Sequence, residues 1–319
     1  MPIDFPNSPA NGATYDYNGV RYTFKTTAGE GYWQILSPAS IGGIAIAKYA
    51  AASQKRNWPT LANSATDADH DIDFSAGIIL DSTGEVPMEA AAMTKRIDAT
   101  WVAGDGNGGR VGSLGQRDTF HCFVISKEDG TTDFGFDNEL DASVLMAAAA
   151  SADFVFHKYI GTIITDGTSN IRAFYQRGDT FSWVTPLEDV HIQGGYTNTT
   201  ELNWRPIGSI PDGLKCQVDM NVYIGDAEGE HNCLAIYFYT NDGDASHLPA
   251  TIPYGSGRPP FFQLFNQDGA GDPEAMAQLT LWTNDDSSIT YQLRSNLASF
   301  IPDQVMWSVN SFTQDRSLI

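Results

Sequence analysis

The run DADHDID places aspartates at every second position, Asp67, Asp69, Asp71 and Asp73. Alternate residues of an extended chain point to one side, so the four carboxylates would repel one another unless water or a cation screens them. An EF-hand calcium loop needs glycine in its sixth position, where this run has Ile72. We therefore expect a solvated entry to a strand, and cation binding by the run stays open.

Two further segments match the sequence motifs of known sites but lack the neighbouring elements that those sites require. The stretch GDGNGGRVGSLGQ, Gly104 to Gln116, is similar to a phosphate-binding loop, but no amphipathic helix follows it. We expect a flexible surface loop there. The triplet DFG, Asp133 to Gly135, occurs without the glycine-rich loop, the lysine strand or the H-R-D motif of a kinase, which indicates a chance match.

No catalytic motif is present. The six histidines form no H-x-x-x-H or H-E-x-x-H pair, and no G-x-S-x-G elbow presents a serine. The sequence therefore predicts no catalytic residue, no metal site and no cofactor. Glycoside hydrolysis stays open, because a pair of carboxylates leaves no sequence signature.

Charge and composition exclude several classes of protein. The chain of 319 residues has 18 Lys and Arg against 39 Asp and Glu, a formal charge of -21, and no basic cluster that would suit nucleic acid. No secretory signal is expected at the first residues. No membrane span is expected either, because the best apolar run, 41–52, is interrupted by Lys48. Cys122, Cys216 and Cys233 are predicted to be buried thiols, and a disulfide between the last two stays open.

The first residues predict a small sheet rich in aromatic side chains. Asn18-Gly19 favours a type I′ hairpin between two alternating runs, and a third run covers 32–36. A sheet of this size is marginal in water, so its aromatic face needs a partner surface, either other protein or the rest of the chain. The side chains concerned are Tyr15, Tyr17, Tyr22, Phe24, Tyr32 and Trp33.

The remaining elements predict an all-β chain: a small N-terminal β-hairpin module, a short helix, then antiparallel β-sandwich or jelly-roll-like domains. The helix is expected within 41–56, after Ser37-Pro38, and a second helical stretch at 141–151. Residues 171, 173 and 175 alternate as a strand, and Leu214 to Ile224 alternates between apolar and polar residues. The predicted domains are 1–36, a helix and linker at 37–66, a β-sandwich at 67–190, and a C-terminal β-sandwich at 191–319.

Parts of this sequence resemble structural proteins of tailed bacteriophages. FPNSPANGATYDYNGVRYTF and GYWQIL are similar to N-terminal modules of tail fibres and tailspikes. ATDADHDIDFSAG, MTKRIDATWVAGDGNGG and NIRAFYQRGDTFSW resemble a recurrent phage virion domain. The likeness covers roughly the first 190 residues, and the last third is similar only in being rich in strands.

The resemblance implies a virion protein, generally a homotrimer, that is assembled in the host cytoplasm and contacts other phage virion proteins through its N-terminal aromatic sheet. It implies that the C-terminal domain binds host surface glycan or protein, and Tyr223, Tyr254 and Trp282 are candidate contact residues because flat rings cover sugar faces. Coverage of these rings by a neighbouring subunit is the other interpretation. Two alternatives stay open: a decoration fibre of the head, neck or tail without a receptor role, and a glycan-degrading tailspike.

Overall fold

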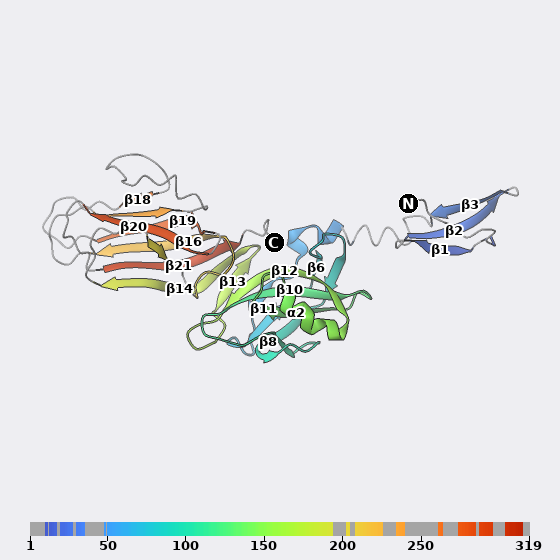
Figure 1. Cartoon of the computed structure of the whole chain (residues 1–319), viewed down its shortest axis with the longest axis horizontal. Coiled ribbons are helices and arrows are strands. Elements are labelled where there is room, and N and C mark those ends of the chain that lie inside the picture. The colour runs from blue at the N-terminus through green and yellow to red at the C-terminus, as the bar shows by residue number, and fades with distance from the viewer. Residues whose placement is uncertain are drawn as a thin grey trace.

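Strands make up most of the regular structure in the residues that the structure describes, which confirms the all-β prediction (Figure 1). A computed structural model describes residues 10–11, 13–17, 20–27, 30–35, 48, 50–193, 202–204, 208–225, 234–239, 261–263, 274–284, 287–295 and 304–314. None of the described helices is long and apolar enough to cross a membrane.

The N-terminal module is an antiparallel sheet of β1 (Thr14–Tyr17), β2 (Val20–Thr27) and β3 (Glu30–Ile35). Tyr17 pairs with Val20, which leaves the two-residue connection predicted for the hairpin. The register places Tyr15, Tyr17, Tyr22, Phe24 and Trp33 at positions on one face. Tyr32 pairs with Lys25 on the opposite face, so its inclusion in the aromatic face was wrong. Adjacent strand residues occupy opposite faces, and Tyr32 directly precedes Trp33.

The helix predicted within 41–56 ends at Ala52. Residues 48 and 50–52 are helical, and a short 3-10 turn η1 (Lys55–Asn57) follows. Asn57 Nδ2 donates to Ala51 O, and Trp58 Nε1 donates to Ala52 O, both at 2.9 Å. These side chains add hydrogen bonds to carbonyl groups of the last helical residues and so cap the helix end.

Residues 61–164 form a seven-stranded sheet whose centre mixes parallel and antiparallel pairs. Its order is β12 (Phe154–Ile164), β10 (Thr119–Lys127), β11 (Thr132–Asp137), β9 (Gly108–Arg110), β8 (Met93–Thr100), β5 (Asp71–Phe74) and β4 (Leu61–Asn63). Only β9 pairs in parallel within this sheet, with β8 and with β11. β6 (Gly77–Leu80) and β7 (Pro87–Ala90) form a separate two-stranded hairpin, which is not paired with this sheet. The helical stretch predicted at 141–151 is confirmed as α2 (Ser143–Ala149) and the turn η2 (Ala150–Ala152).

The glycine-rich segment is partly a buried strand, so the expectation of a flexible surface loop was wrong. Gly108 and Gly109 are buried in β9, between β8 and β11. A Cβ on Gly108 would meet the backbone oxygen of Thr100, and one on Gly109 would lie 2.7 Å from the ring of Phe136. The glycines therefore allow three strands and an aromatic ring to approach closely.

Replacing Gly108 by alanine is expected to lower the free energy of unfolding by about 1–3 kcal/mol, because the clash is with backbone and cannot be relieved by a rotamer change. Gly167→Ala is the matched control, since nothing lies within 4 Å of a Cβ added there. Urea denaturation of both variants measures the difference. Equal stabilities would contradict the close approach of β8 and β9.

Two further sheets form the C-terminal part. The five-stranded sheet has the order β13 (Phe174–Arg177), β14 (Thr180–Gln193), β21 (Gln304–Gln314), β16 (Cys216–Gly225) and β19 (Glu274–Trp282). The four-stranded sheet has the order β15 (Leu202–Trp204), β20 (Ile289–Ser295), β17 (Leu234–Tyr239) and β18 (Phe261–Gln263). Ile289 is buried in one cluster with Val218 and Phe312 of the five-stranded sheet, as in a sandwich.

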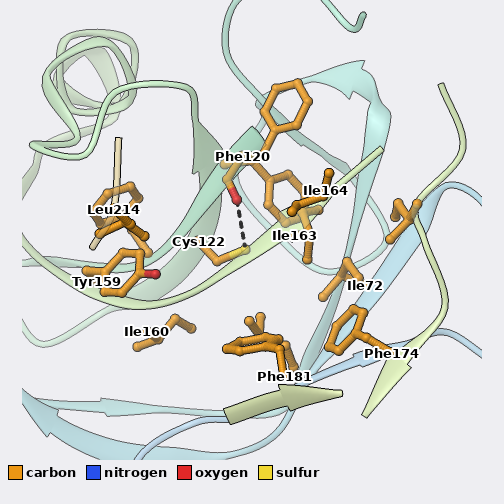
Figure 2. Close-up of a cluster of buried hydrophobic side chains, with 14 of the residues drawn as sticks. Ile72, Phe120, Cys122, Tyr159, Ile160, Ile163, Ile164, Phe174, Phe181 and Leu214 are labelled. Atoms are coloured by element: carbon orange, nitrogen blue, oxygen red, sulfur yellow. Dashed lines mark hydrogen bonds between the residues drawn. The ribbon is translucent and has the colours of Figure 1, made fainter. Parts of the chain in front are cut away.

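The hydrophobic core runs continuously from the seven-stranded sheet to the five-stranded sheet. Tyr159 of β12, Phe181 of β14 and Leu214 belong to one buried cluster (Figure 2). Residue 190, where a domain boundary is predicted, lies within β14. Cys122 and Cys216 are buried in this cluster, as predicted, and Cys233 lies outside the described residues.

Candidate functional site

One face of the five-stranded sheet packs on the core, and the other carries the residues predicted to contact a ligand. In β16, Cys216, Val218, Met220 and Val222 are fully buried, which confirms the predicted alternation. The register therefore places the intervening residues and their cross-strand partners on the opposite side. The residues of this outer sheet face include Tyr175, Arg177, Glu188, Gln217, Asp219, Asn221, Tyr223, Glu274, Met276, Gln278, Thr280, Trp282, Met306, Ser308 and Ser311.

The structure brings two of the three predicted contact residues to this face. Tyr223 pairs with Met276, and Trp282 pairs with Gln217. The two aromatic residues are thus six positions apart along the sheet, about 20 Å at roughly 3.3 Å per residue. Trp282 is 37% exposed and Met276 is 74% exposed. Tyr254, the third candidate, lies outside the described residues.

A third aromatic residue, Tyr175, belongs to the outer sheet face and was not predicted as a contact. It lies opposite Ser182, in a row that continues through Ser311 to Asp219, and it is 65% exposed. The alternation of 171, 173 and 175 suggested one face, but Ile171 is buried and Tyr175 is exposed. The residue that shows which face is buried is Phe174, next to Tyr175 in the chain. Its ring centroid lies 5.5 Å from that of the buried Phe181, so Tyr175 occupies the opposite face.

Tyr223 borders a shallow depression of about 470 Å³. Pro186, Met276 and Met306 supply apolar walls, and Asn221 and Ser308 supply polar groups. Such a lining suits a sugar ring, which has apolar faces and polar hydroxyl groups.

Hydrogen bonds between strands hold the outer sheet face in place. Asp219 accepts a hydrogen bond from Thr280 Oγ1 at one carboxylate oxygen and from Ser311 Oγ, at 2.9 Å, at the other. Asn221 Nδ2 donates to Asn310 Oδ1 at 2.9 Å. Asp219 shares this face with Arg177, Glu188 and Glu274, which the strand register places in the same cross-strand rows. The hydrogen bonds between strands make the centre of the face rigid, and its aromatic side chains are typical of binding surfaces.

The aspartate run does not form a row of carboxylates on one side. Asp67 begins a turn and accepts backbone N–H groups of Asp69 and His70, each at 3.2 Å, so only Asp71 and Asp73 lie in a strand. Burial, followed by repulsion from Asp67, raises the pKa of Asp71. Within the described ranges no three His, Cys, Asp or Glu side chains are placed to hold a metal ion.

A buried ion pair was missed by sequence analysis because its partners lie far apart in the chain. Lys95 Nζ lies 2.7 Å from Asp133 Oδ1, and the two side chains are 0% and 2% exposed. The ammonium also donates to the carbonyls of Val102, at 2.8 Å, and Gly104, at 2.9 Å. Burial lowers the pKa of Lys95, and the hydrogen bond to Asp133 opposes that shift. The aspartate of the DFG triplet therefore fixes a loop in the core.

A second groove, of about 960 Å³, lies between the end of the first helix and the β6–β7 hairpin. Lys48 and Glu89 form an ion pair of 2.6 Å there, and Trp58 contributes to the lining. Arg56 is the remaining charged residue of the lining, and the groove has fewer aromatic residues than the outer sheet face, which we therefore regard as the stronger candidate.

Comparison with known proteins leaves the family open. No protein-family model matches the sequence, and no curated protein matches it. Two solved structures of infectious bursal disease virus, from the Gt strain and the Gx strain, align with 12% and 13% sequence identity and TM-scores of 0.17 and 0.19. The alignments cover 80% and 95% of this chain but 64% and 65% of those chains, less than two thirds of their length. Scores this low establish no common fold.

Proposed function

We propose that this chain is a bacteriophage virion structural protein of the tail-fibre or spike type, which binds the host surface through its C-terminal sandwich. The virion assignment rests on the sequence resemblance of the first 190 residues. The binding role rests on one observation, the outer sheet face, where Tyr175, Tyr223 and Trp282 stand among amide and hydroxyl side chains.

Attachment to the particle is assigned to residues 1–36, in a homotrimer. The support is the backbone register of the first sheet, which lines up Tyr15, Tyr17, Tyr22, Phe24 and Trp33 on one face. A sheet of three short strands gains stability when such a face is covered by other protein.

The ligand class proposed for the outer sheet face is an uncharged part of a surface glycan. Aromatic rings cover the apolar faces of sugars, while amides and hydroxyls exchange hydrogen bonds with sugar hydroxyls. A chain with a formal charge of -21 repels anionic ligands at long range, and Arg177 is the one Lys or Arg that the described pairing places on this face, against the acidic residues Glu188, Asp219 and Glu274.

Replacing Trp282 by alanine is expected to weaken binding to host cells at least tenfold, because truncation of a central aromatic contact costs about 1.4 kcal/mol or more. Tyr175→Ala is expected to act in the same direction. Val102→Ala is the control, since Val102 is 56% exposed in the seven-stranded part of the chain. Adsorption of the purified protein to host cells measures all three.

The alternatives give different results. Undiminished adsorption by both aromatic variants would exclude the outer sheet face as the receptor site. If the protein does not adsorb at all but is found in purified particles, the decoration role is favoured. Release of reducing ends from host polysaccharide by the purified protein would favour the tailspike alternative.

A further inference from the structure

The sheets of this protein differ in how their edges are protected. An edge strand exposes unpaired backbone N–H and C=O groups, and soluble proteins protect such edges by short length, by Lys or Pro, or by β-bulges. β4, β15 and β18 have three residues each, and β13 has four residues and includes Arg177. β12 is long, but it contains Lys158, its pairing with β10 is bulged, and His157 O accepts a hydrogen bond from Ser82 N.

β19 has none of these protections. It is nine residues long, its sequence EAMAQLTLW contains no Lys, Arg or Pro, and its pairing with β16 is unbroken. Within the described part of the chain, β16 is its only partner strand. The exposed residues Met276, Gln278 and Trp282 alternate with the less exposed Ala277, Leu279 and Leu281. The edge is therefore a regular template for another strand.

We propose that β19 pairs with β19 of a second copy of this chain, in antiparallel orientation about a two-fold axis at Gln278. With this register all nine residues are paired, and Gln278 lies opposite Gln278 of the second copy. Ala277 then lies opposite Leu279 of the second copy. Even-numbered residues meet even-numbered residues, so the core side and the outer side of both sheets stay continuous.

Charge favours the antiparallel orientation over a parallel one. Glu274, the only charged residue of β19, lies opposite Trp282 of the second copy in the antiparallel pair. A parallel pair would set the two Glu274 residues side by side, where like charges destabilise a sheet. Two chains of formal charge -21 repel each other at long range, and β19 adds a single charge over its nine residues, which the antiparallel pair places at opposite ends of the two strands. The contact would be isologous, as in most dimers.

The pairing is independent of the proposed receptor role and of the trimer assigned to residues 1–36. It uses the edge of the sheet and leaves the outer sheet face open, so the faces of two copies would form one surface. Loss of host binding with intact pairing would count against the proposed function only.

The test is a pair of substitutions at Gln278 in the full chain. Gln278→Cys is expected to give a disulfide-linked pair of chains under mild oxidation, because residues directly opposite in a sheet have Cβ atoms about 4.5–5.5 Å apart. Thr280→Cys on the same strand is the control, since Thr280 would face Met276 of the second copy and not itself. The unsubstituted protein is a second control, which shows whether the native cysteines form cross-links under the same conditions.

Gln278→Lys places like charges at the two-fold axis and is expected to halve the particle mass measured by light scattering. Gln217→Lys is the matched control, because Gln217 lies on the same face in β16, inside the sheet. Cross-linking of Gln278→Cys together with dissociation of Gln278→Lys supports the pairing. Failure to cross-link, or a mass that Gln278→Lys leaves unchanged, would overturn it.

Discussion

Replacing Asp133 by asparagine is expected to lower the free energy of unfolding by about 3–5 kcal/mol, because it leaves the ammonium of Lys95 buried without its counter-ion. Lys95 is fully buried and has only carbonyl oxygens as its other hydrogen-bond acceptors, at Val102 and Gly104. Urea denaturation at neutral pH measures the loss. Since Asp133 also accepts the N–H of Gly104 at 2.7 Å, the loop that begins there is expected to open first.

Two controls separate the buried charge from other effects. Asp98→Asn removes the exposed ion pair with Arg96, at 2.9 Å, and is expected to change stability far less, because solvent screens such pairs. Adding Lys95→Met to Asp133→Asn removes the buried ammonium and is expected to restore part of the loss. If Asp133→Asn costs no more than Asp98→Asn, the ion pair does not stabilise the core.

Acidification is expected to destabilise the folded chain through His121. Burial lowers the pKa of this imidazole from 6.5 to about 4, and its Nδ1 lies 3.1 Å from Thr162 Oγ1. The unfolded chain takes up the proton near pH 6.5 and the folded chain only near pH 4. Stability therefore falls as the pH drops through this window, by about 3 kcal/mol in total at 1.36 kcal/mol per pKa unit.

The variants His121→Gln and His121→Phe both remove this titration. Each is expected to show a flatter dependence of unfolding free energy on pH between 6.5 and 4 than the unsubstituted protein. Carboxylates contribute equally to all three proteins, so the difference between the profiles isolates His121. Profiles that run parallel would contradict a neutral, buried imidazole.

Local patterns in the sequence determined the strands and turns that depend on neighbouring residues. The alternation from Leu214 to Ile224 predicts one buried and one outward face, and the structure buries Cys216, Val218, Met220 and Val222. Asn18-Gly19 predicts a two-residue hairpin because both residues tolerate positive φ, and Tyr17 pairs with Val20. Tyr223 and Trp282 were predicted to be outward-facing aromatic residues, and the register places both on the outer sheet face.

Only the tertiary structure decided features that join distant segments. β9 is a strand because β8 and β11 lie on either side of its glycines, whereas the same residues alone are typical of a loop. Lys95 and Asp133 meet across 38 positions, and Tyr175 joins the outer sheet face through pairing with β14. Strand pairing over such separations depends on the path of the whole chain, and a local pattern does not carry that information.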